Sequence, residues 1–123
     1  MQNVLKVDIL EKFSLVNEYY TPKQVTVLNN TAVKIAKFKG PFTWHTHDNA
    51  DELFWVLRGE LSIEIKDSEP MTATENQFIL IPQGVEHRPN PSNEAWVVLL
   101  EPDGLLNTGN VVNEHTVKDI EYI

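Results

Sequence analysis

The stretch Gly40–Gly59, GPFTWHTHDNADELFWVLRG, decides the fold and the chemistry predicted for this chain of 123 residues. Successive side chains of a β-strand point to opposite faces, so His45 and His47, one residue apart, project in the same direction. Glu52 follows a short polar segment, 48–51, which is long enough to turn the chain and return an oxygen ligand from the neighbouring strand. The two imidazoles and the carboxylate are therefore candidate ligands of one metal ion.

A fourth candidate ligand, His87, follows the turn sequence Pro82-Gln83-Gly84 after two further residues. This rigid turn fixes the direction of the histidine, and a ligand requires a fixed direction. Three neutral imidazole nitrogens and one carboxylate oxygen form a borderline-hard donor set, which suits one divalent ion of Fe, Mn, Ni, Co, Cu or Zn. His115 has no partner at ligand spacing, and we expect it to be a surface residue.

Each of these residues also has a simpler structural interpretation. With four histidines in the chain, a His-x-His pair arises by chance roughly one time in ten, so the pair alone could be a solvent-facing one on an edge strand. Glu52 could be one of many surface acids, but an apolar strand begins at the next residue, and a charge at a buried border needs a partner. His87 could be a loop histidine. A barrel without metal is disfavoured, because clustered donors facing one cavity would be partly unsatisfied polar groups.

The joint arrangement resembles the cupin family. The first cupin motif reads glycine, five residues, His-x-His, three or four residues, Glu, six residues, glycine; here four residues separate Gly40 from His45, and the later gaps fit. The second motif reads glycine, five residues, Pro-x-Gly, two residues, His, three residues, Asn. The positions that match it are Pro82, Gly84 and His87.

Two positions depart from the second motif, since Asn76 replaces its glycine and Pro91 its final asparagine, with Asn90 one residue early. Asn tolerates a positive φ better than most residues, so we expect Asn76 to replace the turn glycine. The resemblance implies an all-β fold, a double-stranded β-helix or jelly-roll barrel with a metal inside its mouth. We place an N-terminal arm at 1–22, the barrel at 23–104, and a C-terminal extension that packs on the barrel at 105–123.

Turn residues along the chain punctuate about eight to ten short strands, the number expected of a double-sheet jelly roll. Leu61, Ile63 and Ile65 alternate with polar residues, which predicts a half-buried strand. The segment 9–16 is predicted to be a short helix or an irregular arm, and 117–122 a short helix or an edge strand. Strands are expected at 25–28, 32–39, 43–47, 53–58, 61–66, 72–74, 78–81, 85–88 and 95–101.

Length and composition predict a single compact domain. The chain contains no cysteine, which excludes disulfides and thiolate metal sites, and no apolar signal region follows its first residues, so we expect a cytoplasmic protein. Its apolar runs are shorter than the ~20 residues that span a membrane. The net charge of −8 opposes binding to nucleic acid or anionic lipid, because both partners attract clustered Lys and Arg.

Strand parity suggests which other side chains contact a small-molecule ligand. If the ligands face a cavity, four further side chains share their faces: Thr43, Phe54, Val56 and Arg58. Trp44 and Trp55 then point away. Arg58 could bind a carboxylate or phosphate, although a residue before a turn glycine more often faces solvent.

Four protein ligands leave two positions of an octahedral ion open, and the bound ion would act as a Lewis acid or lower the pKa of bound water. The cupin fold hosts many reactions, so it does not decide this one. We expect a small metalloenzyme acting on a polar metabolite such as a sugar, sugar acid or keto acid, of the isomerase or dioxygenase type. The alternative is a non-enzymatic metal- or metabolite-binding module, which the lack of an obvious general base favours.

The chain is also similar to short bacterial cupins likened to mannose-6-phosphate isomerase. Phosphate recognition needs several basic groups, however, and only Arg58 is suitably placed. Cupins often dimerise through an N-terminal strand added to the partner's sheet. The resemblance therefore implies a homodimer, with the segment Phe13–Val27, including Tyr19 and Tyr20, as the edge.

Overall fold

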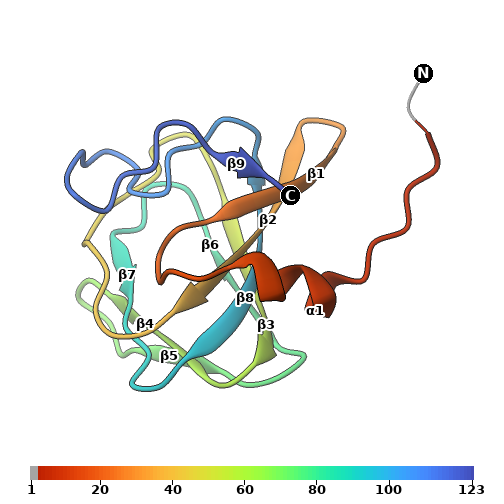
Figure 1. The fold of residues 1–123 in the computed structure, drawn as a ribbon. Coiled ribbons are helices and arrows are strands. Elements are labelled where there is room, and N and C mark those ends of the chain that lie inside the picture. The colour runs from red at the N-terminus through yellow and green to blue at the C-terminus, as the bar shows by residue number, and fades with distance from the viewer. Residues whose placement is uncertain (1–2) are drawn as a thin grey trace.

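The computed structural model describes residues 3–123, which form two β-sheets wrapped into a barrel, with a helical turn beside it (Figure 1). The helical part is α1 (Ile9–Lys12), continued by a 3-10 turn, η1 (Phe13–Leu15). The strands are β1 (Lys23–Leu28), β2 (Thr31–Phe38), β3 (Glu52–Arg58), β4 (Leu61–Ile65), β5 (Met71–Ala73), β6 (Phe78–Ile81), β7 (His87–Pro89), β8 (Ala95–Pro102) and β9 (Glu121–Tyr122).

The larger sheet has six strands in the order β6-β3-β8-β2-β1-β9, and the smaller one has three in the order β5-β4-β7. All the pairings are antiparallel except that of β1 with the C-terminal β9. The predicted all-β jelly roll is confirmed. For the segment 117–122, the structure contains the edge strand and not the helix.

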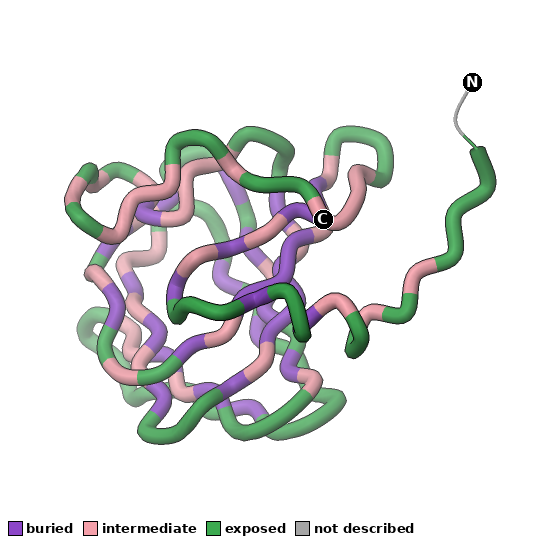
Figure 2. Tube along the Cα trace, viewed as in Figure 1, coloured by how far each residue is buried: buried purple, intermediate pink, exposed green. Residues whose placement is uncertain are grey.

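The main core lies between the two sheets, where the buried part of the chain is concentrated (Figure 2). Alternation builds this core, because every second side chain of a strand points inward. In β4, Leu61 and Ile63 are fully buried, and in β6, Ile79 and Ile81 are buried while Phe78 and Leu80 are exposed. The two sheets thereby enclose a closely packed core.

A second apolar cluster covers the outer face of the large sheet. Phe13 and Val16 of the N-terminal segment pack there against Ile35 and Val98. The start of the segment expected to pair with a partner subunit therefore packs against the large sheet of its own chain. Strand β1 also pairs with β2 along its length and with β9 at Lys23 and Gln24, so part of its expected free edge is occupied.

The segment 43–47 does not form the predicted strand, and that prediction is wrong. Only His45 makes a strand-like bridge, with His87, through two backbone hydrogen bonds of 3.0 Å. The backbone N–H and C=O of Thr46 instead pair with Asn110, at 2.9 and 3.0 Å. The C-terminal segment takes the hydrogen bonds that a neighbouring strand would have taken.

Asn76 adopts a φ of +68°, so it does replace a turn glycine as predicted. Its backbone N–H donates to Val56 O at 2.9 Å, which ties the turn before β6 to β3. Since β6 and β3 are neighbours, this turn helps to fix the strand that begins with Glu52.

Candidate metal centre and its cavity

Four side chains from three parts of the chain converge in the interior of the protein. Glu52 is the first residue of β3, His87 is the first residue of β7, and His45 and His47 come from the segment bridged to β7. One donor atom from each lies within 4.8 Å of the others, and all four residues are buried. Two donors on opposite sides of one ion are two bond lengths apart, and zinc–nitrogen and zinc–oxygen bonds measure about 2.0–2.2 Å. The separation of the donor atoms here is close to two such bond lengths. One ion can therefore lie between these donors.

The backbone orients two of the imidazoles. His45 Nδ1 lies 2.8 Å from Thr43 O, and His87 Nδ1 lies 2.9 Å from Val85 O. A carbonyl oxygen only accepts, so each Nδ1 carries the proton and each Nε2 is left with a lone pair. The free nitrogens are the ones available to bind an ion.

Four buried side-chain atoms within residues 3–123 lack a hydrogen-bond partner, and all of them belong to this group: His47 Nδ1 and Nε2, Glu52 Oε1 and His87 Nε2. Glu52 Oε1 lies 3.3 Å from His47 Nε2 and 3.6 Å from His87 Nε2. Buried polar atoms are rarely left unpaired, because each loses its water without compensation. A cation would pair with Glu52 Oε1, His87 Nε2 and one nitrogen of His47, so the donor set fits a metal ion.

The pKa of His45 is lowered to about 4, chiefly because burial disfavours the charged imidazolium. His45 is therefore neutral near pH 7, the form that binds metal. Burial by itself would raise the pKa of Glu52, but the close imidazoles of His47 and His87 and the neighbouring Glu101 carboxyl hold that pKa below its usual range. Glu52 is thus a carboxylate ready to act as a ligand.

Behind Glu52 lies a buried ion pair that the sequence analysis missed. Leu53 pairs with Leu100 across β3 and β8, so Glu52 and Glu101 are neighbours one position further along. Glu101 Oε2 accepts a hydrogen bond of 3.0 Å from Lys34 Nζ, and both side chains are almost wholly buried. Lys34 also donates to Leu105 O at 3.1 Å. Burial raises the pKa of Glu101 well above its usual value, and the neighbouring Glu52 carboxylate adds to this effect.

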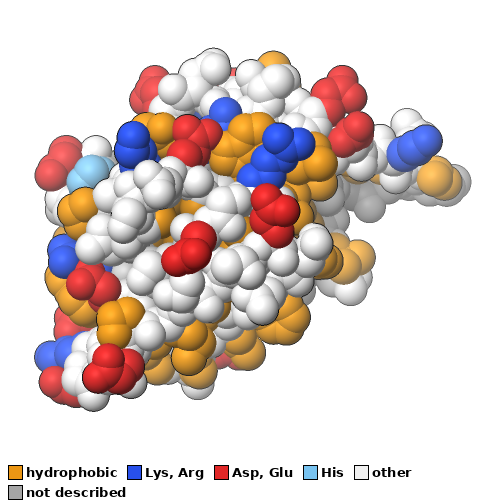
Figure 3. All heavy atoms as spheres, turned by 90° about the horizontal axis from the view of Figure 1, so that it is seen from below, with side chains coloured by type: hydrophobic (Ala, Val, Ile, Leu, Met, Phe, Trp, Pro, Cys, Tyr) orange, Lys and Arg blue, Asp and Glu red, His pale blue; other side chains and the backbone are white. Residues whose placement is uncertain are grey.

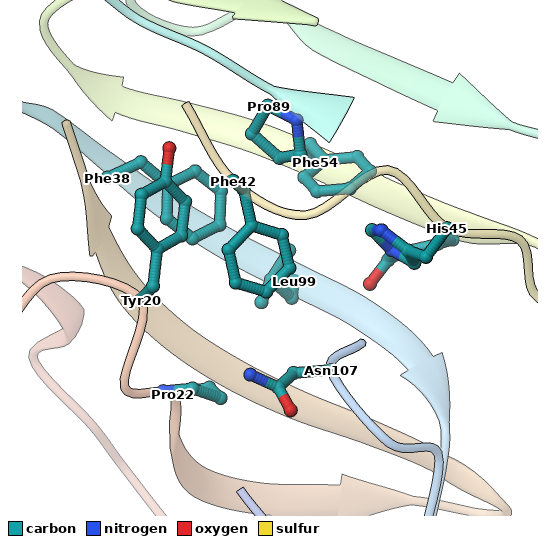
Figure 4. A pocket seen from close by; sticks show the side chains of 10 residues that line it. Tyr20, Pro22, Phe38, Phe42, His45, Phe54, Pro89, Leu99 and Asn107 are labelled. Carbon is teal, nitrogen blue, oxygen red and sulfur yellow. The ribbon is translucent and has the colours of Figure 1, made fainter. Parts of the chain in front are cut away.

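A small cavity adjoins the donor group, since two of the donors, His45 and Glu52, also line the cavity. Figure 4 shows the rings of Tyr20, Phe38 and Phe42 side by side, with His45 across from them. The cavity has a volume of about 20 Å³. The remaining lining residues are Pro22, Phe54, Pro89, Leu99 and Asn107.

The C-terminal segment closes one side of this region. Besides the Asn110–Thr46 pair, Asn113 Nδ2 donates to Thr43 Oγ1 at 2.9 Å. Gly109 lies so close that a Cβ added there would be 2.1 Å from Thr46 O and 3.0 Å from His45 Cδ2. The segment therefore packs directly against the backbone that carries His45.

The four side chains expected to contact a ligand lie in different places. Phe54 lines the cavity, whereas Val56 is buried in the barrel core and is absent from the lining. The hydroxyl of Thr43 is held by Asn113. Arg58 is exposed, and its guanidinium lies 5.0 Å from the centre of the Trp96 ring, away from the cavity.

Trp44 and Trp55 point away from the site, as parity predicts, since 37% and 42% of their surfaces are exposed. His115 is outside the donor group but is not a free surface residue. Its ring lies 5.4 Å from that of Phe42, and 38% of its side chain is exposed.

The face shown in Figure 3 carries isolated basic side chains among acidic and hydrophobic ones, with no basic cluster. None of the helices in residues 3–123 has the length and apolar character needed to cross a membrane.

Comparison with known proteins identifies the family. Residues 33–101, more than half of the chain, match the cupin domain, a span that contains all four candidate ligands. The chain is 39% identical over 88 residues to uncharacterized protein YdbB of Bacillus subtilis (strain 168), covering 72% of this chain and 74% of that protein. The chain therefore belongs to the cupin family.

Solved structures agree with this assignment. A cupin-2 domain containing protein from Shewanella frigidimarina NCIMB 400 superposes with a TM-score of 0.75 at 34% identity, covering 78% of this chain and 93% of that one. Protein NMB1881 from Neisseria meningitidis superposes with a TM-score of 0.74 at 24% identity, covering 80% of this chain and 100% of that one. The similarity to NMB1881, at this lower identity, supports the fold alone.

Proposed function

We propose that this cupin binds one divalent transition-metal ion through His45, His47, Glu52 and His87, and that a small molecule completes the coordination shell. The buried donor atoms without hydrogen-bond partners carry this proposal, because one ion would be a shared partner for Glu52 Oε1, His87 Nε2 and one nitrogen of His47. When bound, such an ion supplies Lewis-acid chemistry. The protein holds His45 and His87 in the tautomer and the direction that ligation needs.

Elemental analysis tests this proposal directly. Protein purified without a histidine tag should contain near-stoichiometric transition metal, and so should His115→Ala, which changes a histidine outside the donor group. Single alanine substitutions of the four proposed ligands should lose it. A parent protein that stays empty after incubation with Fe(II), Mn(II), Ni(II) and Zn(II) would refute the proposal.

The favoured activity is that of a small metalloenzyme of the isomerase or dioxygenase type. The cavity beside the donor group supports it, since a molecule held there would touch a metal bound by His45 and Glu52. The Tyr20 hydroxyl donates to Gly40 O, so Glu52 would be the lining side chain that handles a proton. Turnover by the metal-loaded protein would support this activity.

The second candidate function is a non-enzymatic binding module. The observation in its favour is that no uncommitted general base lies among the lining residues. Tight binding of a metabolite that the metal-loaded protein leaves chemically unchanged would favour this candidate.

We also propose a homodimer, as the family resemblance implies. Its interface would have to use surfaces other than the packed segment around Phe13 and Val16, such as the exposed side chains of Trp55, Phe78 and Leu80. Light scattering at micromolar concentration checks the mass, and a monomer would contradict this proposal.

A further inference from the structure

The cavity offers a bound molecule few free hydrogen-bonding groups. Most of its lining is aromatic or aliphatic: Pro22, Phe38, Phe42, Phe54, Pro89 and Leu99. Four lining residues carry polar side-chain atoms. Two of these, His45 and Glu52, belong to the proposed metal ligands. The other two are Tyr20 and Asn107.

Both of the other polar side chains are already committed. The Tyr20 hydroxyl donates to Gly40 O. Asn107 Nδ2 donates to His115 O at 2.8 Å, and its Oδ1 accepts from Val117 N at 2.9 Å. Asn107 thereby holds the C-terminal segment in place. A ligand hydroxyl in this cavity could use only the second N–H of Asn107 and the remaining lone pairs of these two side chains, unless it broke one of these bonds.

Size gives a second restriction. A volume of about 20 Å³ only slightly exceeds the ~10–15 Å³ that one water molecule needs. A sugar ring cannot enter without displacing part of the lining. The cavity therefore accepts a group of very few atoms beside the metal.

We infer that the ligand of this site is a compact molecule in which a metal-chelating pair of oxygens carries a small apolar body. This inference rests on the proposed metal site. Among the metabolites suggested by the sequence, a short-chain keto acid belongs to this class. A sugar or a sugar acid does not, because it is too large for the cavity and its several hydroxyls would lose water while finding few partners.

Two probes with the same chelating head isolate the effect of the lining. Acetohydroxamic acid carries a methyl group where 2-hydroxyacetohydroxamic acid carries a hydroxymethyl group. Calorimetry with nickel-loaded protein would measure both affinities, each corrected for the affinity of the same probe for Ni(II) in water. We expect acetohydroxamic acid to bind roughly tenfold more tightly or better, the factor for one unpaired buried hydroxyl. Equal affinities, or a preference for the hydroxylated probe, would overturn the inference.

A pair of matched variants tests the lining itself. Phe42→Leu enlarges the cavity, whereas Phe13→Leu makes the same change in the cluster outside the large sheet. The affinity of propanohydroxamic acid relative to acetohydroxamic acid should rise several-fold in Phe42→Leu and stay unchanged in Phe13→Leu. Equal affinity ratios in the two variants would contradict the claim that the cavity lining limits the size of the ligand. The comparison of probes on the parent protein stands even if Phe42→Leu does not fold.

The two proposals fail in different ways. A protein that takes up no nickel overturns both the metal site and the ligand class. A protein that takes up nickel but does not distinguish the probes overturns only the ligand class.

Discussion

Lys34 Nζ lies 3.0 Å from Glu101 Oε2, and only 4% and 2% of these two side chains are exposed. Glu101 is a neighbour of Glu52. Among the Lys–Glu ion pairs of residues 3–123, this is the one in which both side chains are buried. A charge so deep in the barrel is stable only while its partner is present.

Removing one partner of this pair should destabilise the fold strongly. Lys34→Met leaves the Glu101 carboxyl beside Glu52 without its cation, and we expect a loss on the order of 3 kcal/mol in the free energy of unfolding. Lys23→Met, which breaks the partly exposed pair with Glu121, should cost at most about 1 kcal/mol. Urea unfolding of both variants measures the difference. Losses of equal size would show that the buried pair has no special role.

Gly109 should matter for metal affinity, and Gly104 should not. Both residues have a positive φ, +55° and +84°, so alanine strains the backbone at either position. Only at Gly109 does the added Cβ press on Thr46 and His45, while nothing lies within 4 Å of one at Gly104. We expect Gly109→Ala to weaken metal binding by roughly 10-fold or more, the range for residues that orient ligands. Competition with a chelator measures both affinities, and an equal effect in the two variants would contradict this prediction.

The metal-free protein should lose stability as the pH falls from 6.5 to 4. The pKa of His45 is about 4 in the folded protein, against 6.5 for the free side chain, so the unfolded chain binds a proton first. Folding therefore becomes less favourable across this range and levels off below it, with a total loss of about 3 kcal/mol. Urea unfolding in a chelator at several pH values measures this loss. The difference between the parent and His45→Asn should follow the same profile, and a flat difference would refute it.

Metal should raise the thermal stability of the parent protein, because an ion that binds only the folded state shifts the unfolding equilibrium. At a metal concentration 100 times the dissociation constant, the gain is about 2.7 kcal/mol. Zn(II) added to chelator-treated protein should therefore raise the melting temperature of the parent and of His115→Ala. Glu52→Ala should respond little, and an equal shift in Glu52→Ala would place the ion elsewhere.

The parts of the site that depend on local spacing were predictable. His45 and His47 both belong to the donor group, as their spacing predicts, although the segment that carries them is not a regular strand; His87 follows the turn at Pro82–Gly84. Phe54 lines the cavity and Trp55 is exposed, as the alternation of side chains along a strand predicts. Arg58 is exposed, the alternative that its position before a turn glycine favoured, and a shift in the β3–β8 register falls between Val56 and Arg58.

The buried pair left a signal that the sequence analysis did not use. Lys34 shares the inward face of β2 with Ala32 and Ala36, and Glu101 shares the inward face of β8 with Leu99. One cation and one anion at core positions of different strands predict a buried ion pair. Local sequence patterns do not reveal that β2 and β8 are neighbours, and they do not reveal the path of the C-terminal segment. Both depend on contacts between residues far apart in the sequence.

The match to the cupin domain ends at residue 101, yet Asn107 lines the cavity and Gly109 packs on the segment that carries His45. The common domain thus supplies the four ligands, while a separate stretch of chain supplies part of the wall around them. Substitutions in that stretch can change which molecule fits without altering any ligand. Two cupins with identical metal-binding motifs can therefore differ in what they accept, and such divergence would be invisible to a comparison limited to the motifs.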